Sequence, residues 1–113
     1  MSDKALAAIL ANLGSARPEL EALYKDIHAH PELSMQETRT SGIAADHLKA
    51  FGFAVTAGVG KTGVVGILRN GDGPTVMLRA DMDGLPVQEA TGLSYASTAT
   101  GTEPGGKTVP VAH

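Results

Sequence analysis

Two acidic residues at the end of an apolar run are the strongest candidates for chemistry in this sequence. Asp81 and Asp83 follow residues 75–80 and precede Gly84 and Pro86, which would stop a strand. With one residue between them on an extended backbone, the two side chains are predicted to point to the same side of the chain. Such carboxylates can bind a metal, share a proton or orient a metal-bound histidine. Asp is also common in solvated turns, so the spacing alone does not choose among these roles.

A glycine-rich segment, residues 58–63, has the letters of a dinucleotide-binding fingerprint. That motif and the phosphate-binding loop both need a helix after the glycines, because the phosphate lies at the helix N-terminus. Here an apolar strand pattern follows, at residues 64–69. The segment therefore predicts a glycine-rich β-turn rather than a nucleotide site.

Two histidines, His28 and His30, flank Ala29 near the end of a predicted helix. At 3.6 residues per turn their side chains would point about 200° apart, which does not suit joint metal binding. We interpret them as hydrogen-bonding residues that hold the helix end and the turn at Pro31. His47 lies on the apolar side of its helix and is predicted to be a partly buried structural histidine.

Composition limits the classes of function. Nine Lys and Arg against twelve Asp and Glu give a formal charge of −3, and the basic residues form no run. This argues against binding to nucleic acid or to an anionic membrane. No apolar stretch resembles a signal peptide or a membrane span, so a cytoplasmic location is predicted. The chain has no cysteine, so it contains neither disulfides nor thiolate ligands.

Two helices are predicted at the start of the chain. The first covers residues 3–13 and ends near Gly14. The second begins with Pro18 in its first turn and ends before Pro31, because the residue preceding a proline disfavours helical geometry. It carries an apolar stripe at helical spacing, formed by Leu20, Leu23, Tyr24 and Ile27.

A third helix is predicted from near Met35 to Gly52, with Ser34 and Glu37 as a capping box. Its inner face would consist of Ile43, Ala44, His47, Leu48 and Phe51. The periodicity then changes to that of strands at residues 53–57, 64–69 and 75–80, the last two forming an antiparallel hairpin.

After the short first helix, the predicted order is therefore α-α-β-β-β. This is an α/β fold class, with helices followed by a mixed sheet. Residues 97–107, rich in Thr and Gly, are predicted to be an exposed loop, and no linker divides the chain.

Two long motifs resemble those of a known family. Residues 24–37 (YKDIHAHPELSMQE) and 78–89 (LRADMDGLPVQE) are similar to the amino-terminal part of the M20 family of metallo-amidohydrolases. The nearest branch contains hippurate hydrolases, N-acyl-amino-acid amidohydrolases and plant auxin-conjugate hydrolases. The resemblance implies that residues 1–113 are the amino-terminal portion of a zinc-peptidase-like catalytic domain, without the lid or dimerisation domain.

The resemblance also implies a parent enzyme that uses two divalent metal ions such as zinc or manganese and forms a homo-oligomer. Its substrate would be a small molecule, an N-acyl amino acid or a small peptide, cleaved at the amide bond. In this branch a His is followed shortly by a Cys-Gly-His-Asp run that supplies ligands, and residues 109–113 resemble the approach to that run. Metal ligands are therefore expected after His113, and the chain alone is expected to bind no metal stably and to be inactive.

The resemblance assigns roles to the acidic pair as well. Asp83 matches the acid that orients a metal-binding histidine in related peptidases. Asp81 falls where those peptidases have the ligand histidine itself, but an Asp is usual in this branch. Both are therefore predicted to position other groups rather than to bind metal. Two alternatives stay open: a dipeptidase or aminopeptidase of the same superfamily, and a non-catalytic binding module that retains the fold.

Overall fold

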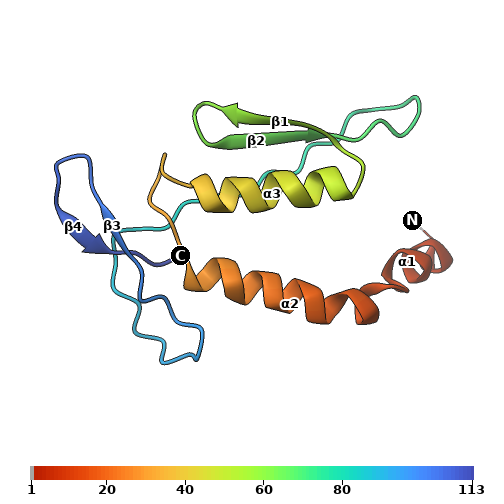
Figure 1. Cartoon of the computed structure of the whole chain (residues 1–113). Coiled ribbons are helices and arrows are strands. Elements are labelled where there is room, and N and C mark those ends of the chain that lie inside the picture. Colours follow the sequence, from red (N-terminus) through yellow and green to blue (C-terminus); the bar gives the residue numbers. More distant parts are fainter. Residues whose placement is uncertain (1) are drawn as a thin grey trace.

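The computed structural model describes residues 2–113 and arranges them as an elongated chain of locally packed parts (Figure 1). Its helices and strands are α1 (Asp3–Leu10), α2 (Leu13–Ala29), α3 (Thr38–Ala50), β1 (Ala54–Val59), β2 (Gly63–Ile67), β3 (Thr100–Thr102) and β4 (Thr108–Pro110). The principal extents are 51 × 33 × 22 Å and the radius of gyration is 17.1 Å. A compact domain of 100 residues has a radius of gyration of about 13 Å, so packing is concentrated in particular regions.

The first two helices are divided earlier than the sequence predicts. Helix α1 ends at Leu10, and α2 already begins at Leu13, so Pro18 lies inside α2 rather than in its first turn. Proline at this position removes one backbone hydrogen bond, the one to the carbonyl four residues earlier. The predicted end of α2 is confirmed, because the helix stops at Ala29, two residues before Pro31.

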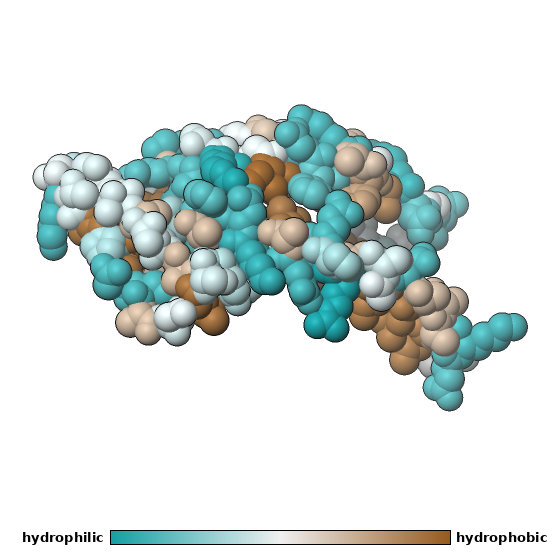
Figure 2. Space-filling model, turned by 60° about the horizontal axis from the view of Figure 1, so that its bottom comes forward, coloured by the Kyte–Doolittle hydropathy of each residue, from teal (hydrophilic) through white to brown (hydrophobic). Residues whose placement is uncertain are grey.

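The surface of α1 is apolar where it faces solvent. Leu6, Ile9 and Leu10 are all exposed, as is Leu13 at the start of α2. Figure 2 shows brown surface at the end of the molecule that carries α1 in Figure 1. Within residues 2–113, no helix combines the length and apolar character needed to cross a membrane.

Helix α3 receives its N-terminal cap from Glu32, which lies outside the helix. The Glu32 carboxylate accepts the backbone N–H groups of Arg39 at 2.9 Å and Thr40 at 2.8 Å, and the hydroxyls of Thr38 and Thr40. Burial raises the pKa of Glu32, but these hydrogen bonds outweigh it and leave the pKa below its ordinary value. Glu32 thus satisfies amides that a helix cannot pair internally.

The predicted capping box of Ser34 and Glu37 is wrong. Met35 adopts a positive φ of 64°, so the chain turns there and α3 begins only at Thr38. Glu37 is buried and accepts the Thr62 hydroxyl at 2.6 Å, which ties the start of α3 to the turn before β2.

Strands β1 and β2 form an antiparallel hairpin that packs on α3 (Figure 1). Gly66 permits this packing, because a Cβ there would lie 3.1 Å from Leu48 and 3.2 Å from Phe53. Four of the five residues predicted for the inner face of α3 are half-buried, whereas Phe51 is exposed and Ala45 is buried instead. The turn at residues 58–63 is confirmed as a β-turn region, with Gly60 and Lys61 at positive φ.

The predicted strand at residues 75–80 is absent, and so is its predicted hairpin with β2. Val76, Met77 and Leu78 are 82%, 83% and 95% exposed. Strand β2 pairs with β1 instead, and within residues 2–113 no strand pairs with this run. An apolar run of this kind is stable as a strand only with neighbours on its edges and layers over its faces.

A second packed region contains the buried cluster of Leu33, Val109 and Val111. Strands β3 and β4 form an antiparallel hairpin beside it. The prediction of an exposed loop at residues 97–107 is therefore wrong in part, since Ser97 is buried and residues 100–102 form β3. Gly101 allows the close approach, because a Cβ there would lie 2.7 Å from Leu33 Cδ1.

Candidate active-site wall

Three segments that are distant in the sequence meet where the acidic motif ends. We call this region the Asp83–His113 corner; it comprises residues 32–33, 83–85 and 111–113. Leu33 forms a parallel bridge with Gly84, and Leu85 forms an antiparallel bridge with Ala112. The backbone hydrogen bonds are short: Gly84 N–H to the Glu32 carbonyl at 2.7 Å, and Leu85 N–H to the Ala112 carbonyl at 2.7 Å. The corner therefore holds the acidic motif against the last residues of the chain.

Gly84 is the residue that lets these segments close. A Cβ at this position would lie 2.8 Å from Val111 Cγ1 and 3.0 Å from Pro31 Cβ. Contacts this short force neighbours to shift, and Gly84 is itself buried. A side chain at position 84 would therefore force Val111 or Pro31 to move.

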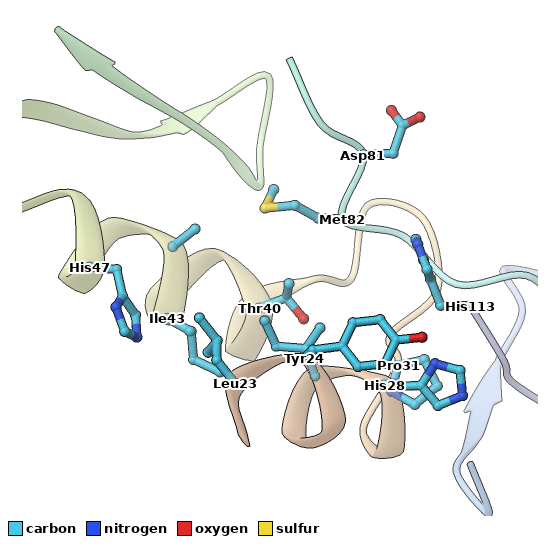
Figure 3. A pocket seen from close by; sticks show the side chains of 12 residues that line it. Leu23, Tyr24, His28, Pro31, Thr40, Ile43, His47, Asp81, Met82 and His113 are labelled. Atoms are coloured by element: carbon cyan, nitrogen blue, oxygen red, sulfur yellow. The ribbon is translucent and has the colours of Figure 1, made fainter. Parts of the chain in front are cut away.

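The exposed ring of His113 is hydrogen-bonded within the corner. Its Nδ1 lies 2.7 Å from the Asp83 carbonyl oxygen, and a carbonyl can only accept, so Nδ1 carries the proton. In the neutral ring, Nε2 is then the unprotonated acceptor. His113 borders a largely apolar pocket of about 350 Å³ between α2 and α3 (Figure 3). The lining also includes Leu23, Tyr24, Ile27, His28, Ile43, His47, Asp81 and Met82.

The two predicted site carboxylates border different hollows. Asp81 lines the larger pocket, but its carboxylate points away from the other labelled side chains in Figure 3 and accepts Arg79 Nη2 at 2.5 Å. Asp83 lines a second pocket with Leu33 and Glu103. The structure therefore does not bring the two acids together, and their role in positioning other groups stays a prediction.

A buried hydrogen-bonded cluster lies beside the corner, centred on Glu89. The Glu89 side chain is only 5% exposed, and its carboxylate oxygens lie 3.0 and 3.1 Å from His28 Nε2. The carboxylate also accepts the Thr91 hydroxyl at 2.5 Å and the Ser97 backbone N–H at 2.6 Å. The Thr91 hydroxyl, His28 and the Ser97 N–H together lower the pKa of Glu89 to about 2. Because Glu89 is ionised, His28 Nε2 carries the proton in this pair.

No family model matches the chain, but individual known proteins are similar to it. The chain is 48% identical over 80 residues to a hippurate hydrolase of Campylobacter jejuni, covering 70% of this chain and 21% of that protein. It is 48% identical over 79 residues to thermostable carboxypeptidase 1 of Saccharolobus solfataricus, covering 68% and 20% respectively.

A solved structure is also similar, with a TM-score of 0.71 and 32% identity over 88% of this chain and 26% of the other. It is the YXEP protein of Bacillus subtilis, described as a dinuclear metal binding peptidase from the M20 family. The chain belongs to the M20 family. This confirms the family resemblance and the α/β fold class, as part of an M20 catalytic fold. The M20 chain spans about a fifth of the length of the curated relatives it matches.

The donor set of this M20 chain does not by itself make a dinuclear centre. Among residues 2–113, no three His, Asp or Glu side chains are grouped so that they could hold a metal ion. A two-metal site needs several such ligands around each ion. The described residues therefore do not fit two metal ions without further ligands.

The remaining histidines of the M20 chain act as the sequence predicts. His30 Nδ1 donates to the Asp26 carbonyl at 2.7 Å, which confirms its role at the end of α2. His47 is half-buried, beside the ring of Phe51. Glu89 lies within the second family motif, but the motif alone does not predict that its carboxylate is hydrogen-bonded to His28, Thr91 and Ser97. Its partners come from positions 28, 91 and 97, and no local pattern joins them.

Proposed function

We propose that this M20 chain forms one wall of the active site of a metal-dependent amidohydrolase that cleaves the amide bond of N-acyl amino acids. The observation that carries the proposal is the 48% identity over 80 residues to a hippurate hydrolase. Hippurate is an N-acyl amino acid with a single amide bond. The similarity to a dinuclear M20 peptidase supports two divalent ions, such as zinc or manganese, in the complete protein.

In this proposal the described residues position the metal site and do not supply its ligands. Asp83 and, to a smaller extent, Asp81 orient groups of the metal site, and the ligands lie after His113. The chain then represents the amino-terminal portion of the catalytic domain, and the lid or dimerisation domain is supplied by other residues of a homo-oligomeric protein. The corner supports this arrangement, because it places His113 at the pocket that Asp81 also borders.

The test is an amide-hydrolysis assay on the protein expressed from the complete reading frame. We expect hippurate and N-acetyl amino acids to be hydrolysed, activity to be lost with a chelator, and activity to return with zinc or manganese. Residues 1–113 alone serve as the control and should be inactive. A metal-replete complete protein that hydrolyses none of these amides would overturn the proposal.

A second candidate is a dipeptidase or aminopeptidase of the same family, favoured by the peptidase description of the similar structure. The two functions differ in what they require of the substrate nitrogen. Matched pairs of a dipeptide and its N-acetylated form separate them. Hydrolysis of the free dipeptide alone indicates a dipeptidase or aminopeptidase, whereas hydrolysis of the N-acetylated form supports the amidohydrolase.

A further inference from the structure

The Glu89 cluster is linked to His113 by hydrogen bonds through Ser97 to Val111 and then by the backbone from Val111 to His113. Glu89 accepts the backbone N–H of Ser97, and the Ser97 hydroxyl donates to the Val111 carbonyl at 2.6 Å. The Val111 N–H is held in turn by the Ala99 carbonyl at 3.0 Å. Both polar groups of the Val111 backbone are therefore fixed, two residues before His113.

The other end of the series reaches the acidic motif. Ala112 exchanges hydrogen bonds with Leu85 at 2.7 and 3.1 Å, and His113 Nδ1 donates to the Asp83 carbonyl. Each link fixes the next, so the orientation of the His113 ring depends on where Val111 is held. Hydrogen bonds to ionised groups are also the stronger ones, which makes the Glu89 end the firm anchor.

The series is buried at its Glu89 and Ser97 end, whereas the His113 ring at its other end is exposed. The side chains of Glu89 and His28 are 5% and 12% exposed, and Ser97 is 5% exposed. Removing one partner from a buried network leaves the other groups unpaired, which costs more than the bond itself contributes. A carboxylate is needed at position 89, because both of its oxygens accept, one from Thr91 and the other from Ser97.

We propose that Glu89 is a positioning residue for the M20 site: through Ser97 and Val111 it sets His113 on the Asp83 carbonyl, with Nε2 left free. That His113 belongs to the site rests on the proposed function, whereas the series of hydrogen bonds stands on the chain itself. Glu89 touches neither Asp83 nor His113 and acts only through the groups between them.

The test measures the tautomer of His113 by ¹⁵N NMR in residues 1–113, comparing the wild type with Glu89→Gln. In the wild type, the neutral His113 ring should carry its proton on Nδ1. In Glu89→Gln, an amide donor faces Ser97 or Thr91, so the series loosens. The tautomer should then shift toward Nε2–H, the form that a free histidine ring favours. Hydrogen exchange at Val111 and Ala112 should become about tenfold faster, as expected for a lost charge-assisted hydrogen bond.

The controls separate positioning from general stability. Glu21→Gln removes an exposed carboxylate that pairs only with Arg17, and it should change neither readout. Amides of the β1–β2 hairpin report the separately packed region on α3, so their exchange should stay unchanged in Glu89→Gln. Equal acceleration in the hairpin and at Val111, with the wild-type tautomer retained, would show that Glu89 only stabilises the fold and would overturn the proposal.

Two milder variants keep the test decisive if Glu89→Gln does not fold. Ser97→Ala removes the hydroxyl that holds Val111, and Thr91→Val removes one hydrogen bond to Glu89 without changing its shape. Both should shift the His113 tautomer in the same direction, Ser97→Ala by more. An unchanged tautomer in both folded variants would also overturn the proposal. Neither readout depends on hydrolysis, so a failure here is distinct from a failure of the proposed function.

Discussion

The two halves of one motif behave in opposite ways. Residues 75–80 are mostly apolar and exposed, with no strand beside them among residues 2–113. Residues 83–89 begin three positions later and are held by short hydrogen bonds to segments around Leu33, Ser97 and Ala112. The apolar half needs a sheet to cover it, whereas the second half supplies its own partners. Local sequence character therefore does not tell which half is ordered by contacts within this chain.

The largest expected difference in stability comes from truncating one leucine in each of the two regions. Leu33→Ala removes a side chain from the buried cluster and should lower the free energy of unfolding by about 2–5 kcal/mol. Leu78→Ala, at a position 95% exposed, should change it by less than about 0.5 kcal/mol. Urea denaturation followed by circular dichroism measures both. Equal effects would show that residues 75–80 are packed in solution.

The next test adds a methyl group to the corner. Gly84→Ala places a Cβ against Val111 and Pro31 and should destabilise the fold by about 1–3 kcal/mol. Gly105→Ala is the matched control, because nothing lies within 4 Å of its Cβ position. The midpoint of thermal unfolding should fall for the first variant only. A wild-type midpoint for Gly84→Ala would mean that the corner is looser than its contacts indicate.

The two acids of the motif also differ: Asp83 belongs to the hydrogen-bonded residues 83–89, whereas Asp81 is exposed beside residues 75–80. In the complete protein, Asp83→Asn should lower metal affinity or activity by about 10–100-fold, the usual effect of losing a group that orients a metal ligand. Asp81→Asn should have a smaller effect, and Asp72→Asn in the exposed turn should have none. Steady-state kinetics and metal titration measure these changes. A larger loss for Asp81→Asn would reverse the assignment.

The smallest expected effect concerns pH. The pKa of Glu89 is about 2, below its ordinary value of 4.5, because the Thr91 hydroxyl, His28 and the Ser97 N–H favour the charged form. A lowered folded-state pKa means that the unfolded chain binds more protons between these two values. The Glu89 contribution to stability is therefore complete above about pH 4.5 and is lost as the pH falls toward 2. The stability difference between wild type and Glu89→Gln should shrink over this window, and a constant difference would contradict it.

Several elements were predictable because their causes are local. The end of α2 follows from Pro31, and the turn at residues 58–63 follows from its glycines. The start of α3 was not predictable from Ser34 and Glu37, because Glu32 supplies the cap from outside the helix. The prediction of a strand at residues 75–80 was wrong for a related reason. A strand is stable only when neighbouring strands pair with it, and its own residues do not show whether such neighbours exist.

The sequence by itself determined the family, the acidic motif with Asp81 and Asp83, and the absence of any cysteine ligand in this chain. Residue types and their order carry that information directly. The tertiary structure alone decided that the two acids border different pockets, that His113 donates to the Asp83 carbonyl, and that Glu89 is buried among His28, Thr91 and Ser97. These contacts join positions up to 61 residues apart, and their distances depend on how the whole backbone closes around Gly84.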